Sequence, residues 1–259
     1  MKKFVLALSA VVFGSVAASA ADLPARTVKA LPPAPIYNWT GFYLGVDAGG
    51  GWEQFDGSYV IPPPDRHSSS ASRFLGGGFV GGQYQVSNWV FGAEASYTGF
   101  EDSWSSSVSR SGDCLASIAG RTCTHKFKDL WDIGGKVGFA FDRWMVYGTG
   151  GYASVQLDTQ TLLTGTQTVT SQSSYRHDGW FAGVGADVIV TKWGATDLIL
   201  GLQYKHYEFD NVRHFAATPG LPAPVVPDAN TRDINGKADV VTGRLSVKFG
   251  PAPAVFAKY

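Results

Sequence analysis

The stretch GFYLGVDAGGGWE, residues 41–53, decides the fold class. Large apolar side chains stand at alternate positions of this stretch, namely Phe42, Leu44, Val46 and Trp52. The positions between them hold glycine and the polar or charged residues Tyr43, Asp47 and Glu53. A repeat of two residues predicts a β-strand with one apolar and one polar face. About ten such residues are enough to cross a bilayer as one strand of a β-barrel.

The alternation returns along the chain and ends at Phe249. We expect eight strands, at about 41–53, 74–85, 89–98, 127–141, 144–156, 180–188, 197–209 and 241–249. An even strand count is what a single-chain bacterial membrane barrel requires. The facing of 144–156 is ambiguous, whereas 180–188 alternates clearly, with Trp180 and Phe181 on opposite faces.

The connections alternate between short and long. The short ones are 85–88, 142–143 and 191–196, and the long ones are about 55–73, 103–126, 157–178 and 210–236. Short periplasmic turns and long extracellular loops are typical of outer-membrane barrels. A β-sandwich would also alternate, but it hides its apolar face, whereas glycine and opposite charges here suit a narrow lumen. The prediction is an all-β, eight-stranded antiparallel transmembrane β-barrel.

Aromatic residues gather at the strand ends, as they do at the two interfaces of a membrane. For the periplasmic rim we expect Trp39, Phe42, Tyr84, Trp89, Phe141, Trp144, Trp193 and Phe249. For the outer rim we expect Trp52, Phe74, Phe100, Trp131, Trp180 and Phe209.

The regions outside the strands complete the domain organisation. Residues 1–20 read as a signal peptide, with a basic start, an apolar run and the small residues Ala18-Ser19-Ala20 before the expected cleavage site. Residues 21–38 are a Pro-rich periplasmic leader, 39–250 the barrel and 251–259 a C-terminal tail. These features predict export to the cell outer membrane.

Charge and motifs exclude several functions. The chain has 21 basic and 21 acidic residues, so it offers no basic field for nucleic acid. It contains no nucleophile elbow, metal-binding helix or phosphate loop, and His177 and Asp178 are adjacent residues that point apart on an extended chain. We therefore expect no enzyme, but a monomer whose partners are membrane lipid, lipopolysaccharide and any extracellular ligand of the loops.

Charged residues on the inward face form the first candidate site. The acids are Asp47, Glu94, Asp132 and Asp187, and the bases are Lys136, Lys205, Arg244 and Lys248. The short turns predict that Glu94 lies opposite Lys136 and that Asp47 meets Arg244, and we expect both pairs to form salt bridges. Such a network forms either a proton or ion path or a structural plug. An eight-stranded interior is just wide enough for side chains to fill, which favours the plug.

The only two cysteines, Cys114 and Cys123, fall in the second long loop. In an exported protein we expect them to form a disulfide bond. A metal pair is the alternative, although no histidines stand nearby at finger spacing.

All five histidines map to the extracellular end. His67, His125, His177 and His214 fall one in each long loop, and His206 stands near the top of its strand, with Tyr175 and Tyr207 close in sequence. If the loops converge, imidazole and phenolate groups could ligate haem iron or a divalent metal. The plain alternative is that polar loops collect hydrophilic residues, in which case no cofactor is expected.

Several short motifs resemble one family. NWTGFYLG at 38–45 is joined by VFGAE at 90–94, VYGTGG at 146–151, the glycine-rich 179–185 and the ending AKY. In combination they resemble the outer-membrane immunogenic, porin-like barrel proteins of Gram-negative bacteria. The resemblance implies an eight-stranded outer-membrane barrel, and some relatives are linked to haem binding. Tyr259 departs from the pattern because it lies beyond the final strand.

Two function classes remain. The first is a structural and surface-interaction barrel with a lumen plugged by paired charges. The alternative is transport, by a porin-like small-solute channel or a haem-binding surface receptor. Loop conformation decides ligand specificity, and alternation alone does not reveal it.

Overall fold

The computed structural model describes residues 37–60, 66–100, 105–107, 121–163, 165–222 and 231–250. The predicted signal peptide, most of the leader, Cys114 and the tail lie outside these residues. The strands are β1 Gly41–Tyr59, β2 Arg66–Val86, β3 Trp89–Phe100, β4 Ser105–Ser107, β5 Arg121–Phe141, β6 Trp144–Leu163, β7 Val169–Trp193, β8 Thr196–His214 and β9 Arg232–Phe249. No helix within the described residues is long and apolar enough to cross a membrane.

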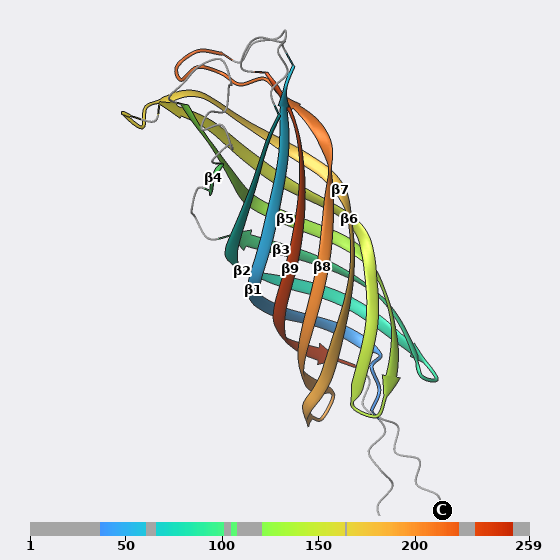
Figure 1. Ribbon diagram of the computed structural model, residues 1–259. Coiled ribbons are helices and arrows are strands. Elements are labelled where there is room, and N and C mark those ends of the chain that lie inside the picture. Colours follow the sequence, from blue (N-terminus) through green and yellow to red (C-terminus); the bar gives the residue numbers. More distant parts are fainter. Residues whose placement is uncertain are drawn as a thin grey trace, which may run out of the picture. The chain divides into compact units, whose positions relative to one another are not determined.

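Eight of these strands form a closed antiparallel ring (Figure 1). The order runs β3-β2-β1-β9-β8-β7-β6-β5, and β3 pairs with β5 to close it. The first and last strands of the chain are neighbours, with Phe42 opposite Phe249. The short strand β4 pairs with residues 123–125 of β5, beyond the point where the β3–β5 ladder ends. The predicted eight-stranded barrel is confirmed.

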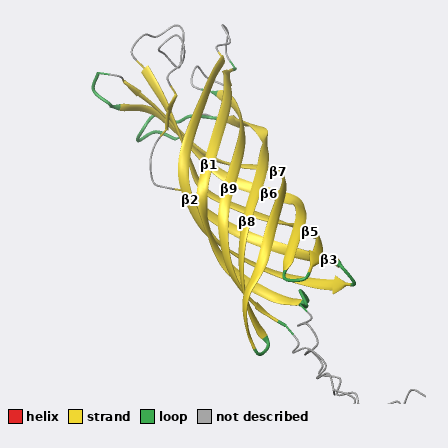
Figure 2. Ribbon diagram, turned by 60° about the horizontal axis from the view of Figure 1, so that its bottom comes forward, coloured by secondary structure: helices red, strands yellow, loops and turns green. Residues whose placement is uncertain are grey.

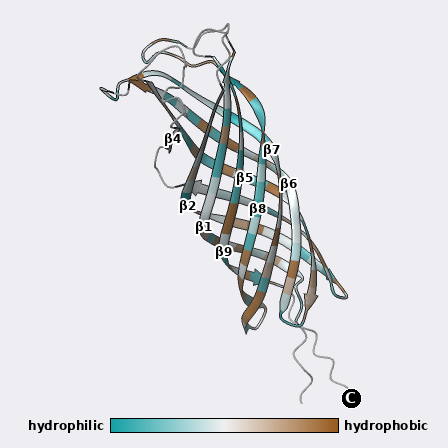
Figure 3. Cartoon of the chain, viewed as in Figure 1, coloured by the Kyte–Doolittle hydropathy of each residue, from teal (hydrophilic) through white to brown (hydrophobic). Residues whose placement is uncertain are grey.

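Side chains alternate between an apolar outer wall and the interior, as the strand period requires. Figure 3 shows hydrophobic and hydrophilic segments following one another along the strands. Phe42 is 76% exposed on the outer wall, whereas its neighbour Tyr43 is buried in the interior. Strand β6, whose facing the sequence left ambiguous, turns Met145 and Tyr147 inward and Trp144 and Val146 outward. An apolar outer wall on a closed barrel is the surface that a bilayer requires.

Two aromatic girdles encircle this wall, and three of the residues predicted for them lie elsewhere. Trp39 and Phe209 are 0% and 3% exposed and point into the interior, and Phe100 packs against the same core as Phe209. Trp39 precedes the first strand, so alternation does not govern its direction. Phe209 shares the parity of Lys205 and therefore faces inward with it.

One end of the barrel carries only short turns, and we refer to it as the turn end. Ser87, Asp142 and Gly194 occupy the left-handed region there, with φ of 55°, 56° and 66°. Positive φ values allow a two-residue connection to match the twist of the strands that it joins. The three predicted short turns are confirmed.

At the opposite end, the loop end, the strands are longer than predicted. Much of the expected loops is strand, since β1 runs to Tyr59, β6 to Leu163 and β7 begins at Val169. Each predicted strand ended where the apolar alternation faded. The hydrogen bonds between strands continue beyond the aromatic girdle, where no lipid requires apolar side chains. Threonine supports this extension because its branched side chain favours strands. His67, His125, His177 and His214 consequently lie on strands, not on loops.

The ring opens partly at the loop end (Figure 2). The β7–β8 ladder stops at Gly179 opposite Phe209, and beyond it a single bridge joins Gln172 to Ala217. Between these points β7 remains paired only with β6, and β8 only with β9. The backbone alone therefore leaves a gap between β7 and β8, and side chains span it.

Candidate functional site

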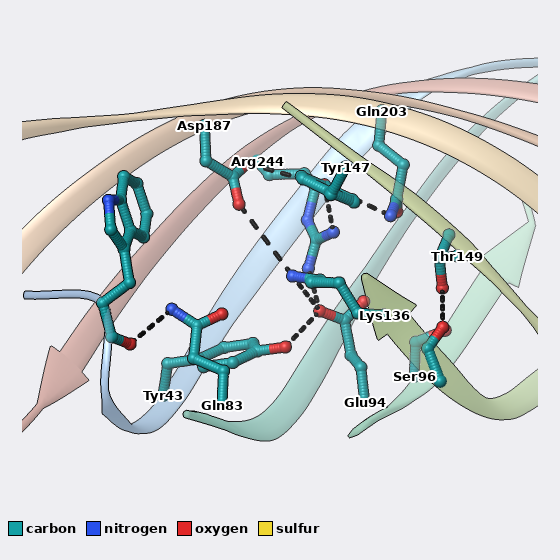
Figure 4. Close-up of polar contacts among 12 residues, drawn as sticks. Tyr43, Gln83, Glu94, Ser96, Lys136, Tyr147, Thr149, Asp187, Gln203 and Arg244 are labelled. Carbon is teal, nitrogen blue, oxygen red and sulfur yellow. Dashed lines mark hydrogen bonds and ion pairs between the residues drawn. The ribbon is translucent and has the colours of Figure 1, made fainter. Parts of the chain in front are cut away.

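The centre of the interior holds a network of buried charges from four strands (Figure 4). Glu94 of β3 is the acceptor on which it converges, and each donor reaches the same oxygen, Oε2. Arg244 of β9 donates to it over 2.6 Å, Tyr43 of β1 over 2.9 Å, and Lys136 of β5 lies 3.2 Å away. All four residues are buried. Because one carboxylate meets two cations and a hydroxyl, β1, β3, β5 and β9 are tied together across the lumen.

A second branch extends the network towards β7 and β8. Arg244 also donates to the Tyr147 hydroxyl over 2.8 Å, and Gln203 donates to the same oxygen over 3.3 Å. The Tyr147 hydroxyl in turn lies 3.5 Å from one carboxylate oxygen of Asp187, and the other oxygen of that carboxylate lies 3.9 Å from the Lys136 ammonium. Each charge in this branch therefore has a partner of opposite sign or a hydroxyl.

Asp132 is the centre of a separate cluster. Lys205 donates to both of its oxygens over 2.9 Å, Ser96 donates over 2.7 Å and Tyr207 over 2.8 Å. The cluster joins β3, β5 and β8. Six of the eight residues predicted for the lumen network thus lie in these two clusters.

The two predicted salt bridges have different outcomes. The Glu94–Lys136 ion pair is confirmed, although the residue directly opposite Glu94 is Gly134. Asp47 does lie directly opposite Arg244, but the predicted ion pair between them is wrong. Arg244 reaches across the lumen to Glu94 instead, where two further groups converge on the carboxylate. Within the described residues, Asp47 forms no ion pair and its buried Oδ1 has no hydrogen-bond partner.

The sequence predictions missed two buried ion pairs. Lys248 lies 2.9 Å from Asp197 near the turn end, and Arg73 lies 3.2 Å from Glu53 nearer the loop end. The inward direction of Asp197 was predictable from the sequence. Asp197 stands eight residues before Lys205 on the same strand, and an even spacing places both on the same face. Arg73 fell in a predicted loop, so the sequence analysis did not assign it to either face of a strand.

Apolar layers lie on both sides of the charge network. The layer nearer the loop end consists of thirteen buried side chains, among them Phe55, Leu75, Phe127, Leu130, Leu157, Phe209 and Ile234. The layer nearer the turn end consists of Trp39, Val90, Ala140, Met145, Tyr147, Ile189 and Ile199. The interior is therefore built as a polar layer between two apolar ones.

Residues 37–40 enter the barrel at the turn end. The Trp39 backbone N–H donates to Gln85 over 2.8 Å, and Gln83 donates to the Trp39 carbonyl over 2.8 Å. The Lys192 ammonium lies 4.5 Å from the centre of the Tyr37 ring. Trp39 is thus anchored by β2 as part of the interior, which replaces its predicted place at the periplasmic rim.

Two tyrosines of the network require glycine opposite them. A Cβ on Gly81 would lie 2.4 Å from the Tyr43 hydroxyl oxygen, and one on Gly185 would lie 2.4 Å from the Tyr147 ring. Real Cβ atoms do not approach other atoms so closely. Glycine therefore creates the space in which each phenol crosses the lumen.

Cys123 is disulfide-bonded, as predicted, and its predicted partner Cys114 lies outside the described residues. The buried Arg232 guanidinium donates to the Cys123 sulfur over 3.3 Å and to the Thr159 hydroxyl over 3.3 Å. The loop-end interior thus combines a disulfide with a buried cation.

The five histidines do not form one site. His206 lies on the outer wall, 2.8 Å from Asp239, and His125 is buried with its ring stacked on Phe55. Of His67, the structure describes only the backbone, opposite Gly57. His177 and His214 do converge, with their Nε2 atoms 2.7 Å apart. Within the described residues, no group of three or more His, Cys, Asp or Glu side chains could hold a metal ion.

The converging pair lies on the loop-end side of the girdle residue Trp180 and is shielded from solvent. Burial lowers the pKa of His177. Burial, followed by the nearby His177 and Arg232, lowers the pKa of His214 to about 3. Both rings are therefore neutral at pH 7. Tyr175 packs its ring on His214 at a centroid distance of 4.7 Å, whereas Tyr207 belongs to the Asp132 cluster.

A closed antiparallel barrel with an apolar outer wall and aromatic girdles defines an outer-membrane β-barrel protein. More particularly, the chain belongs to the outer membrane protein beta-barrel domain family, whose model matches residues 6–249. It therefore resides in the outer membrane.

Two relatives found by sequence support this assignment. The chain is similar to the 31 kDa outer-membrane immunogenic protein of Brucella melitensis biotype 1, with 31% identity over 73% of this chain and 81% of the relative. It is also similar to the 25 kDa outer-membrane immunogenic protein of Brucella canis, with 28% identity over 82% of this chain and 86% of the relative. Among solved structures, Neisserial surface protein A matches with 15% identity and a TM-score of 0.34, covering 81% of this chain and 98% of that protein.

Proposed function

We propose that this protein is a structural barrel of the outer membrane, closed to ions, whose loop end serves as a surface for contact outside the cell. The main observation in favour of a closed lumen is that three buried layers follow one another along the barrel. They contain Trp39, the Glu94 network and Phe127, in that order. An eight-stranded interior is only wide enough for such side chains.

The energetics of the network support closure. An ion that crosses the middle layer must displace Arg244, which is bonded to both Glu94 and Tyr147. Breaking a buried ion pair without replacing its partner costs about 3 to 5 kcal/mol. An ion must also pass two apolar layers, and the charged residues near them, Glu53–Arg73 and Asp197–Lys248, are already paired with each other.

The outer surface of the loop end supports the contact role. Its strands extend beyond the girdle and carry exposed ion pairs, namely Arg213–Asp233, Lys237–Glu208 and Arg176–Asp129. Isolated exposed pairs contribute little to stability, so this wall has no folding need for charge. A polar wall of mixed sign suits contact with lipid headgroups and with molecules outside the cell. The names of the Brucella relatives, which describe immunogenic proteins, agree with surface exposure.

Closure is tested by conductance. We expect the refolded full-length barrel to produce no ion-sized current steps in a planar lipid bilayer, because no layer of the interior can part without breaking buried contacts. A known porin reconstituted in the same bilayers is the positive control. Stable, stepwise currents from the wild-type protein would overturn the closed barrel and favour the transport alternative.

Orientation is tested separately. We expect an epitope inserted between Gly165 and Thr166, at the loop end, to bind antibody on intact cells. An epitope inserted between Gly194 and Ala195, at the turn end, is the matched control and is expected to bind only after permeabilisation. The reverse pattern would show that the loop end faces the periplasm.

A further inference from the structure

The gap between β7 and β8 is spanned by a pair of histidines. His177 of β7 and His214 of β8 meet in the stretch where no backbone ladder joins their strands. His214 faces the interior because β8 has a register shift between Phe209 and Val212, which reverses the alternation beyond it. Irregularities of this kind re-aim side chains and are frequent at functional sites.

The second nitrogen of each ring is also held. The His177 Nδ1–H donates to the Asp210 carbonyl oxygen, with 3.2 Å between the heavy atoms. Its Nε2 therefore carries a lone pair that points at His214. The Nδ1 of His214 lies 3.0 Å from the Ser173 hydroxyl oxygen. Proteins commonly hold metal-binding histidines in this manner, with a hydrogen bond that fixes the ring from its other nitrogen.

Ser173 allows His214 to present a lone pair as well. With no ion bound, the Nε2–H of His214 donates to His177, and its Nδ1 accepts from the Ser173 hydroxyl. When the proton of His214 stands on Nδ1 instead, the Ser173 oxygen accepts it, since a hydroxyl both donates and accepts. Both Nε2 lone pairs then face one point between the strands, and no net proton is released.

The spacing matches one metal geometry best. Metal–nitrogen bonds of about 2.0 Å place two neighbouring ligands about 2.8 Å apart at a right angle and about 3.3 Å apart in a tetrahedron. The observed 2.7 Å between the Nε2 atoms is close to the right-angled arrangement. Tetragonal coordination by nitrogen is characteristic of Cu²⁺, which also binds such ligands more tightly than other divalent first-row metals.

We propose that His177 and His214 form a two-imidazole site for a divalent transition metal ion, with Cu²⁺ bound most tightly. The ion links β7 to β8 across the gap, and water or a small anion completes its coordination. This site lies apart from the lumen network and does not depend on whether the barrel conducts.

The surroundings of the two histidines determine how tightly we expect the metal ion to bind. Both rings are buried and neutral at pH 7, which is the form that binds a metal. The Arg232 cation nearby opposes a second positive charge. We therefore expect binding weaker than in zinc sites with four protein ligands. An anionic ligand on the metal would reduce this repulsion.

The test is electron paramagnetic resonance of Cu²⁺ titrated into the chelator-treated, refolded full-length protein in detergent. At micromolar concentrations we expect one tightly bound ion per chain with couplings to two imidazole nitrogens. His177→Ala and His214→Ala are each expected to abolish the two-nitrogen signal. The matched control is His206→Ala, which removes a half-buried histidine on the outer wall of β8 and is expected to retain that signal.

A second measurement uses the wild type alone, so it does not depend on the variants folding. Cu²⁺ is expected to slow protease cleavage at the loop end, and a chelator is expected to reverse the effect, because bound metal stabilises the joined strands. Absence of a stoichiometric two-nitrogen signal from the wild type would overturn the proposal. Its persistence in the folded His177→Ala, His214→Ala double variant would do the same.

Discussion

Replacing Glu94 with glutamine is expected to lower the free energy of unfolding by about 3 to 5 kcal/mol. The amide has nearly the same shape as the carboxylate, so packing is preserved while the negative charge is lost. Lys136 and Arg244 would then share only the more distant Asp187 as a carboxylate partner within their cluster. Urea unfolding of the barrel in lipid vesicles, followed by tryptophan fluorescence, measures the change.

The matched control for this substitution is Glu208→Gln. Glu208 also pairs with a lysine, at 2.9 Å from Lys237, but on the exposed outer wall. We expect its urea midpoint to equal that of the wild type. Equal midpoints for Glu94→Gln and wild type would show that the central network contributes nothing to stability.

Replacing Phe127 with alanine is expected to cost about 3 to 5 kcal/mol by leaving a cavity in the loop-end apolar layer. Phe127 lies at the centre of this layer, with Phe55, Phe100 and Phe209 at ring-centroid distances of 4.7, 5.7 and 5.9 Å. These neighbours belong to three different strands, β1, β3 and β8, so they cannot all move inward to fill the space. The same urea titration measures this loss.

Phe127→Leu separates volume from side-chain identity. Leucine restores most of the apolar volume, so we expect most of the lost stability to return. The alanine variant is also expected to remain silent in planar bilayers, because an apolar cavity stays dry and the Glu94 layer is intact. A wild-type urea midpoint for Phe127→Ala would contradict close packing of this layer.

The strand alternation predicted the fold because lipid and lumen impose opposite demands on neighbouring residues. It predicted the inward set for the same reason, and Glu94, Asp132 and Arg244 all face inward. It did not predict where the strands end, because hydrogen bonding continues after the apolar pattern fades. The direction of Trp39 was also hidden, since that residue precedes the first strand.

The predicted register and the predicted partners held in different pairs. Glu94 pairs with Lys136 as predicted, although Gly134 stands directly opposite it. Asp47 stands opposite Arg244 as expected, yet a long guanidinium side chain selects its carboxylate by reach across the lumen, not by ladder position. The convergence of His177 and His214 was hidden for a different reason. It depends on one extra residue in β8, and an alternating pattern does not predict where such a residue occurs.

The adjacency of β1 and β9 has a consequence for how this protein is made. Strand β1 is synthesised first, but the edge that pairs with β9 stays unpaired until this last strand is in place. In lipid each unpaired backbone group costs several kcal/mol, so a partly assembled ring cannot rest in the bilayer. Arg244 is a residue of this last strand, and it forms the shortest ion pair of Glu94. Completion of the sheet and neutralisation of its interior are thus a single event, and a chain cut short before β9 achieves neither.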